Sequence, residues 1–385
     1  MIYSLPYILM VVVIGLAALY YQYEEREDYR RYTLWGVVAL MFFFFAFRGY
    51  VSTDWTAYYA DYQKCELENV WNNAYTSTKV LWRIEPGFTL LMWLCKMMVP
   101  NYIFLNVVCT AVNLVLLLRF LRRRLDNPVL GLLLFTCFGG LMLSINLMRN
   151  AISILIFVNT LHYIRQRRPL PFFLWNILGM MFHISAVFFL PCYFFLHRST
   201  NKWVFAAVFV VGNIIFLGRI PIFLSVANLV LGDAGGHLAT VIENYTSGQM
   251  EEAAGISIGY LERLLTATLV WLYYNRLLEV RKDNMLFINS YLIYASLFFY
   301  FSEFRVLSLR FSYLFFFSYW ILWADLPRCF ALKNNRYLFI GFVALYCVLK
   351  THGQMNNIVS EYDNMLLGGR SYEERLYIFN RNYDD

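Results

Sequence analysis

The sequence predicts an all-α polytopic membrane protein, and three observations lead to that class. Of the 385 residues, 60% are hydrophobic and only 15% are charged, whereas soluble domains carry about 25% charged residues. Apolar stretches of roughly 14 to 20 residues recur along nearly the whole chain. They lack the alternation of a membrane β-barrel. We therefore expect a single transmembrane domain over residues 1–385.

The apolar stretches predict about 12 transmembrane helices. The N-terminal stretch has neither the positive n-region nor the cleavage site of a signal peptide, so we expect it to be retained as the first span. In order, the predicted spans are 2–21, 33–47, 101–119, 128–146, 147–165, 170–183, 184–197, 203–218, 258–275, 285–302, 306–324 and 337–350.

Clusters of Lys and Arg between the spans predict the topology. If these short loops are cytoplasmic, both chain ends face outward, and the net charge of +7 needs no nucleic-acid partner. The segments 48–100, 219–257 and 351–385 are then extracytoplasmic. Seven scattered cysteines argue against a disulfide framework.

One apolar segment is too short to fit this scheme. It runs from Glu85 to Asn101 and is interrupted by Pro100, so we expect a re-entrant or interfacial helix within the first outer loop. The spans 170–183 and 184–197 are also short, which would place His183, at their junction, in an outer vestibule.

Charged residues gather at the predicted outer ends of the spans. Charges inside or at the edge of a membrane are costly and indicate a functional cavity, and several guanidinium groups together would bind a diphosphate. The alternative is that single arginines at helix ends extend to the interface. The predicted diphosphate ligands are Arg48, Arg149, Arg305 and Arg310, with Arg83 and Glu303 nearby.

Three residues are candidates for the group that accepts a hydroxyl proton. His183 is the first candidate because histidine is neutral over much of the physiological pH range. Asp54 and Glu85 are rivals for that role, or would orient the base or pair with an arginine. The alternative for His183 is an ordinary hydrogen-bonded histidine.

The first outer loop is rich in aromatic residues. Trp55, Tyr58 and Tyr62 are candidate sugar-binding residues, although Trp and Tyr are also enriched at membrane interfaces. Glu66 and Glu68 form the nearest approach to a metal site, and no zinc motif is present, so we expect neither a metal nor a cofactor.

Five stretches in order resemble the EpsG family, the Wzy-type polymerases of O-antigens and exopolysaccharides. They are RGYVSTDWTAYY from Arg48, EPGF from Glu85, MRNAISI from Met148, FHISAVFFLP from Phe182 and RFSYLFF from Arg310. Three positions depart from the family pattern: Ser52 replaces a usual glycine, Trp55 a tyrosine and Asn150 a glutamine. A serine at position 52 would restrict the turn that presents Asp54.

The resemblance implies a metal-independent glycosyltransferase with a GT-C-like bundle in the bacterial plasma (inner) membrane. It would transfer a glycan from undecaprenyl diphosphate to a sugar hydroxyl of another lipid-linked repeat unit, at the outer face. The expected partners are that lipid-linked oligosaccharide, membrane lipid and a chain-length regulator. Two other classes stay open: a polytopic acyltransferase that modifies a surface glycan, and a transporter or flippase for an anionic lipid.

Overall fold

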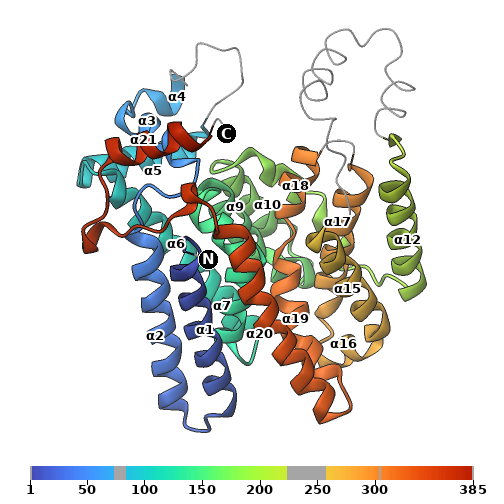
Figure 1. Ribbon diagram of the computed structural model, residues 1–385. Coiled ribbons are helices and arrows are strands. Elements are labelled where there is room, and N and C mark those ends of the chain that lie inside the picture. Colours follow the sequence, from blue (N-terminus) through green and yellow to red (C-terminus); the bar gives the residue numbers. More distant parts are fainter. Residues whose placement is uncertain (1, 73–83, 223–256, 303–304, 384–385) are drawn as a thin grey trace, which may run out of the picture. The chain divides into compact units, whose positions relative to one another are not determined.

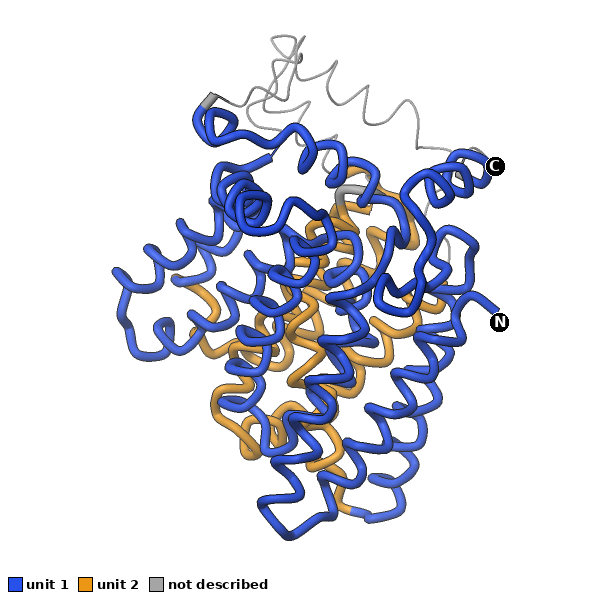
Figure 2. Tube along the Cα trace, turned by 90° about the vertical axis from the view of Figure 1, so that its left-hand side faces the viewer, with its two compact units in different colours: residues 1–193, 332–385 blue, residues 194–331 orange. Residues whose placement is uncertain are grey.

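The computed structural model describes residues 2–72, 84–222, 257–302 and 305–383, and these are predominantly helical, as predicted (Figure 1). No strand occurs in these ranges, although Arg48 and Asn364 form an isolated antiparallel bridge. The chain forms two compact units. Unit 1 comprises Met1–Tyr193 and Leu332–Asp385, and unit 2 comprises Phe194–Ala331 (Figure 2).

Unit 1 contains the first long helices of the chain and its last ones. Its two N-terminal helices, α1 (Leu5–Tyr23) and α2 (Glu27–Ala46), form a hairpin (Figure 1). The following elements are α3 (Trp55–Gln63), α4 (Asn69–Asn72), α5 (Pro86–Met98), α6 (Tyr102–Arg124), α7 (Pro128–Phe135), η1 (Thr136–Gly140), α8 (Leu141–Ile145), α9 (Met148–Arg165), α10 (Pro169–Met180) and η2 (Ile184–Phe189). Within α11 (Cys192–Phe195) the chain enters unit 2, and it returns through α20 (Lys333–Met355), η4 (Ile358–Ser360), η5 (Met365–Leu367) and α21 (Tyr372–Tyr383).

Local sequence signals explain where several of these helices begin. The side chain of Asn101 accepts a hydrogen bond from the Ile103 amide at the start of α6, and Asn127 caps α7 in the same way. Pro86 occupies the first turn of α5, where its missing N–H costs nothing. These caps satisfy amide groups that a helix end otherwise leaves without a partner.

Unit 2 is built around one aromatic-rich helix. This helix, α17 (Asn284–Tyr300), packs against α12 (Lys202–Gly218), α18 (Arg305–Tyr313) and α19 (Phe317–Cys329). The remaining described helices of unit 2 are α15 (Ile258–Leu272) and α16 (Tyr274–Val280). Most of the predicted outer loop 219–257 lies outside the described residues.

The prediction of about 12 transmembrane helices is not confirmed. Within the described residues, four helical segments are long and apolar enough to cross a membrane: α1, α6, the joined α7 to α8, and α20. The predicted span 184–197 is a 3₁₀ turn followed by a short helix, and 306–324 is interrupted between Tyr313 and Phe317. The predicted span 258–275 is divided at Tyr273, and α2 carries charged residues in its first turns.

Many apolar side chains on the long helices face outward. Leu9 and Leu16 of α1 are 56% and 62% exposed, and Leu338 and Leu345 of α20 are 72% and 60% exposed. Soluble monomers rarely expose such continuous apolar surfaces, whereas hydrocarbon tails cover them at little cost. These helices indicate a membrane protein.

Candidate active site

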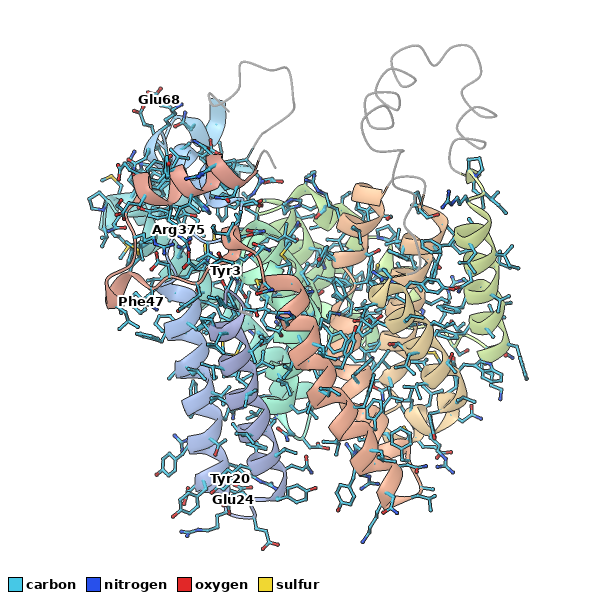
Figure 3. The ribbon with its side chains drawn as sticks, viewed as in Figure 1. Tyr3, Tyr20, Glu24, Phe47, Glu68 and Arg375 are labelled. Atoms are coloured by element: carbon cyan, nitrogen blue, oxygen red, sulfur yellow. The ribbon has the colours of Figure 1, made fainter. Side chains whose placement is uncertain are left out.

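The C-terminal segment of the chain holds the loop that follows α2. Gly49 donates its amide proton to the Asp363 carbonyl over 2.9 Å, and Ser52 donates to Val359 over 2.9 Å. Met365 in turn donates to the Phe47 carbonyl. Figure 3 shows Arg375 of α21 at the same end of unit 1 as Phe47, whereas Tyr20 and Glu24 lie at the opposite end. The loop is therefore fixed by residues about 300 positions away in the chain.

Ion pairs around the buried Arg375 side chain fasten this C-terminal segment. The Arg375 side chain is 2% exposed and lies 3.5 Å from a Glu361 carboxylate oxygen and 3.7 Å from an Asp363 oxygen. Arg370 also pairs with Glu361. Burial lowers the pKa of Arg375, and the two carboxylates oppose that shift. The charges compensate one another, so the segment can be buried.

Arg48 is buried at the end of α2 and hydrogen-bonds to the surrounding backbone. It is 4% exposed, and one terminal nitrogen donates to the Phe45 carbonyl over 2.6 Å. The other contacts Asn106 Oδ1 at 3.3 Å and the Ile145 carbonyl at 3.4 Å. These bonds satisfy carbonyls at the C-terminal ends of α2 and α8. Diphosphate binding by Arg48 stays a prediction, and the observed contacts give this residue a role in joining two helix ends.

Ser52 adopts a backbone conformation that favours glycine. Its φ of 68° lies in the left-handed region. Its hydroxyl accepts a 2.9 Å hydrogen bond from Asn146, and the Asn146 amide oxygen accepts from the Thr53 amide at 3.4 Å. A serine at this position therefore makes a hydrogen bond with Asn146 that the usual glycine could not make. The turn leads to Asp54, which is half-buried, precedes α3 and accepts a 3.1 Å hydrogen bond from the Thr53 hydroxyl.

Arg149 lies at the centre of the site, in the first turn of α9. Its Nη1 atom is 2.6 Å from Glu85 Oε2, and its Nε atom donates to the Tyr58 hydroxyl over 3.2 Å. The side chains of Arg149 and Glu85 are 21% and 7% exposed. Burial raises the pKa of the Tyr58 phenol, and Arg149 opposes that rise. Three predicted site residues from three separate motifs therefore meet here.

Glu85 also connects this group to the segment that carries His183. Its second oxygen, Oε1, accepts a 2.9 Å hydrogen bond from the Ile184 amide. Two residues further on, Gly87 donates to the Met181 carbonyl over 2.8 Å. A Cβ atom at Gly87 would lie only 2.7 Å from that carbonyl oxygen, so glycine allows the close approach.

His183 has an extended backbone and caps η2. Its Nδ1 atom accepts a 3.2 Å hydrogen bond from the Ser185 amide and lies 2.7 Å from the Ser185 hydroxyl. That hydroxyl is 2.9 Å from Asn150 Oδ1, next to Arg149 in α9. The cap thus connects His183 to the helix that carries the central arginine.

The predicted sugar-binding aromatics are buried. Trp55, Tyr58 and Tyr62 are 4%, 6% and 1% exposed. Trp55 packs edge-on against Tyr372 and Phe379 of α21. Tyr62 packs against Tyr102 and donates to the Val99 carbonyl over 3.0 Å, and burial raises its pKa to about 12. Sugar binding stays a prediction for these residues, which here pack the helices of unit 1 together.

The remaining predicted residues belong to unit 2 or fall outside the described residues. Arg305 and Arg310 belong to α18 in unit 2, where Arg310 is exposed. Arg83 and Glu303 lie outside the described residues. Convergence of all four predicted arginines therefore stays a prediction. The acidic pair Glu66 and Glu68 is exposed, and no group of three or more metal-binding side chains occurs in the part of the chain that the structure describes.

The sequence contained a signal for further residues that the motif analysis did not select. Glu262 and Arg263 interrupt the apolar stretch of α15 and are 4% and 6% exposed. The Arg263 guanidinium lies 3.6 Å from the centre of the Phe298 ring. Two adjacent charged residues within an apolar helix indicate a functional or structural site, and this pattern is visible in the sequence. Ser185 and Asn150 were also missed as partners of His183, because their contact depends on the packing of η2 against α9.

Comparison with known protein families identifies the family of this chain. The family model described as the EpsG family matches residues 31–363, most of the chain. The chain belongs to the EpsG family. This is a family of Wzy-like polymerases, so its members act on lipid-linked oligosaccharides in the membrane. No curated protein and no solved structure matches the chain.

The EpsG match covers the whole candidate site of unit 1. It includes the loop after α2, the Glu85 segment, the start of α9 and the His183 cap. It ends at Asp363, so α21 lies beyond the matched residues. The helix that covers Trp55 thus lies outside the matched region.

Proposed function

We propose that this EpsG-family protein polymerises a polysaccharide at the outer face of the bacterial plasma membrane. In the proposed reaction, a sugar hydroxyl of one lipid-linked repeat unit attacks the anomeric carbon of a glycan carried on undecaprenyl diphosphate. The bond from that carbon to the diphosphate oxygen breaks, and the hydroxyl proton goes to a base. Negative charge develops on the leaving diphosphate.

The observation that carries this proposal is the position of Arg149. A neighbouring carboxylate and a phenol fix its guanidinium, and part of the side chain is open. A fixed cation is what a departing diphosphate needs, because a preorganised donor stabilises developing charge without rearranging during the reaction. The family membership supplies the independent support.

The surrounding residues divide the remaining roles. Both oxygens of Glu85 accept hydrogen bonds, one from Arg149 and one from Ile184, so we assign it the role of orienting Arg149. Asp54 is then the carboxylate proposed as the base, next to the turn at Ser52. The predicted ligands Arg305 and Arg310 stay candidates for a second phosphate contact.

Reconstitution tests the proposal directly. Purified protein in liposomes receives an undecaprenyl-diphosphate-linked repeat unit, and glycan length is read on gels. We expect native protein to lengthen the glycan and Arg149→Ala to be slower by about 100-fold, the usual effect of removing one charge-stabilising donor. Arg119→Ala is the matched control, because Arg119 is exposed on α6 and should leave the rate unchanged.

Two results would contradict the proposal. If native protein leaves the repeat unit unpolymerised but acylates it or moves it across the bilayer, the reaction class is wrong. If native protein polymerises and Arg149→Ala does so equally well, the site is wrong.

A further inference from the structure

Asn150 follows Arg149 in the first turn of α9, and its side chain contacts η2. The Ser185 hydroxyl donates to Asn150 Oδ1 over 2.9 Å. The preceding residue of η2, Ile184, donates its amide proton to Glu85 Oε1, while Glu85 Oε2 pairs with Arg149. These two consecutive residues of α9 are therefore held by one connected set of hydrogen bonds, and Asn150 belongs to the same site as Arg149.

The bond with Ser185 determines which polar atoms of Asn150 the fold leaves unused. An asparagine side chain has a carbonyl oxygen, which accepts, and an amino group, which carries two N–H donors. The oxygen accepts from the Ser185 hydroxyl, so the amino group lies on the other side of the amide. Nδ2 makes no hydrogen bond with any residue that the structure describes, and Asn150 is half-buried. Its donors are therefore open to a ligand.

Two other asparagines of unit 1 have a packing role instead. Asn127 donates through Nδ2 to the Ala18 carbonyl over 2.9 Å, and Asn176 donates in the same way to the Phe172 carbonyl over 2.7 Å. Both asparagines are buried, so their amino groups need these backbone partners. Asn150 differs because the fold uses only its oxygen.

We propose that Asn150 binds the carrier diphosphate together with Arg149, by donating through Nδ2 to a phosphate oxygen. This inference rests on the proposed function and adds a substrate-binding residue to it. Glu85 already pairs with Arg149, so a diphosphate at this site needs further donors. A phosphate oxygen can only accept hydrogen bonds, and Asn150 has its donors left, so the two groups are complementary.

A neutral amide suits this position. Arg149 supplies the positive charge, and an amide adds a hydrogen bond to the anion without placing a second cation next to Arg149. The bond to Ser185 holds the amide before the substrate arrives, so little side-chain freedom is lost on binding. We therefore expect Asn150 to contribute to binding both of the substrate and of the released carrier.

Undecaprenyl diphosphate without any sugar is the probe that tests this contact. Protein in lipid nanodiscs is titrated with this carrier, and the dissociation constant is measured. We expect Asn150→Ala to weaken binding by about 10-fold, the effect of losing one hydrogen bond to a charged group. The same variant should raise the KM for the lipid-linked repeat unit in the polymerisation assay.

Ser185→Ala separates substrate binding from positioning. It removes the bond that holds the amide but leaves the Nδ2 donors of Asn150, so carrier binding should weaken by less than about 3-fold, the cost of ordering one side chain. Equal weakening in Ser185→Ala and Asn150→Ala would mean that Asn150 only positions η2, and would overturn the proposal. Native carrier affinity in Asn150→Ala would also overturn it, and a raised KM in that case would assign Asn150 to the sugar.

Two further variants complete the experiment. Asn380→Ala is the matched control, because Asn380 is exposed on α21 and should keep native carrier affinity. If Asn150→Ala does not fold, Asn150→Asp replaces it: its carboxylate still accepts from Ser185 but has no N–H donor and repels phosphate, so native affinity in this variant would overturn the proposal. Native protein that binds the carrier but lengthens no glycan would count against the proposed function instead.

Discussion

Replacement of Gly87 by alanine tests the contact that joins the Glu85 segment to the His183 segment. The new Cβ atom would lie 2.7 Å from the Met181 carbonyl oxygen and 2.8 Å from the Met181 Cβ atom. Ordinary contact begins at 3.4 Å, so the two backbones must separate by about 0.7 Å, the difference between 3.4 and 2.7 Å. Side-chain rotation cannot relieve a clash with backbone.

The cost follows from the hydrogen bonds at this contact. A separation of that size lengthens the 2.8 Å bond from Gly87 to Met181 to the limit of hydrogen bonding and breaks the 3.3 Å bond from Phe88. Each lost bond costs about 0.5–1.5 kcal/mol, so we expect Gly87→Ala to lower stability by about 1–3 kcal/mol. The Ile184 amide would also move from Glu85, so polymerisation should fall further than stability alone explains.

Thermal unfolding in detergent and the polymerisation assay would be measured together. The matched control is Gly341→Ala, at a helical glycine of α20 with nothing within 4 Å of the added atom. Alanine there should be neutral or stabilising by up to about 1 kcal/mol. Equal melting temperatures and equal polymer lengths in Gly87→Ala and Gly341→Ala would refute the reasoning.

Substitutions at three further positions probe the same site. Glu85→Gln should lower the free energy of unfolding by about 1–3 kcal/mol and slow polymerisation, because an amide cannot accept hydrogen bonds from both Arg149 and Ile184. The control is Glu66→Gln, at an exposed residue, and equal melting curves for the two variants would contradict the expectation. Ser52→Gly should change the unfolding free energy by less than about 1 kcal/mol, because the relieved strain of the left-handed backbone offsets the lost hydrogen bond from Asn146. Ser52→Val should be clearly less stable in chemical denaturation. Arg375→Ala should lower the free energy of unfolding by about 2–3 kcal/mol and shorten the polymer, because it removes both ion pairs. The control is Arg381→Ala, at an exposed residue. An unchanged melting temperature of Arg375→Ala would show that the ion pairs contribute nothing to stability.

Much of the helical pattern could be predicted because its signals are local. Asn101, Asn127 and Ser257 cap helices where the apolar runs begin, and the predicted span from 147 corresponds to α9, which starts at Met148. The breaks within apolar runs had no such signal. Between Tyr313 and Phe317 the sequence is uniformly apolar and aromatic, so packing interrupts a helix that local preference would continue.

The candidate site could be predicted in its residues but not in their contacts. Motifs selected Glu85, Arg149 and His183, and the structure brings all three segments together. The burial of Arg48 depends on carbonyls at Phe45 and Ile145, which no side-chain pattern reveals. Trp55 is covered by Tyr372, a partner that sequence spacing cannot indicate.

The pairing of residues 47–52 with residues 359–365 has a consequence for biosynthesis. The second partner is synthesised about 300 residues after the first. Unit 2 is synthesised between them, so the folding of unit 1 must await the synthesis of residues 359–365. A nascent chain that ends before residue 359 would already hold every motif of the site, yet the loop leading to Asp54 would lack the backbone partners that shape it.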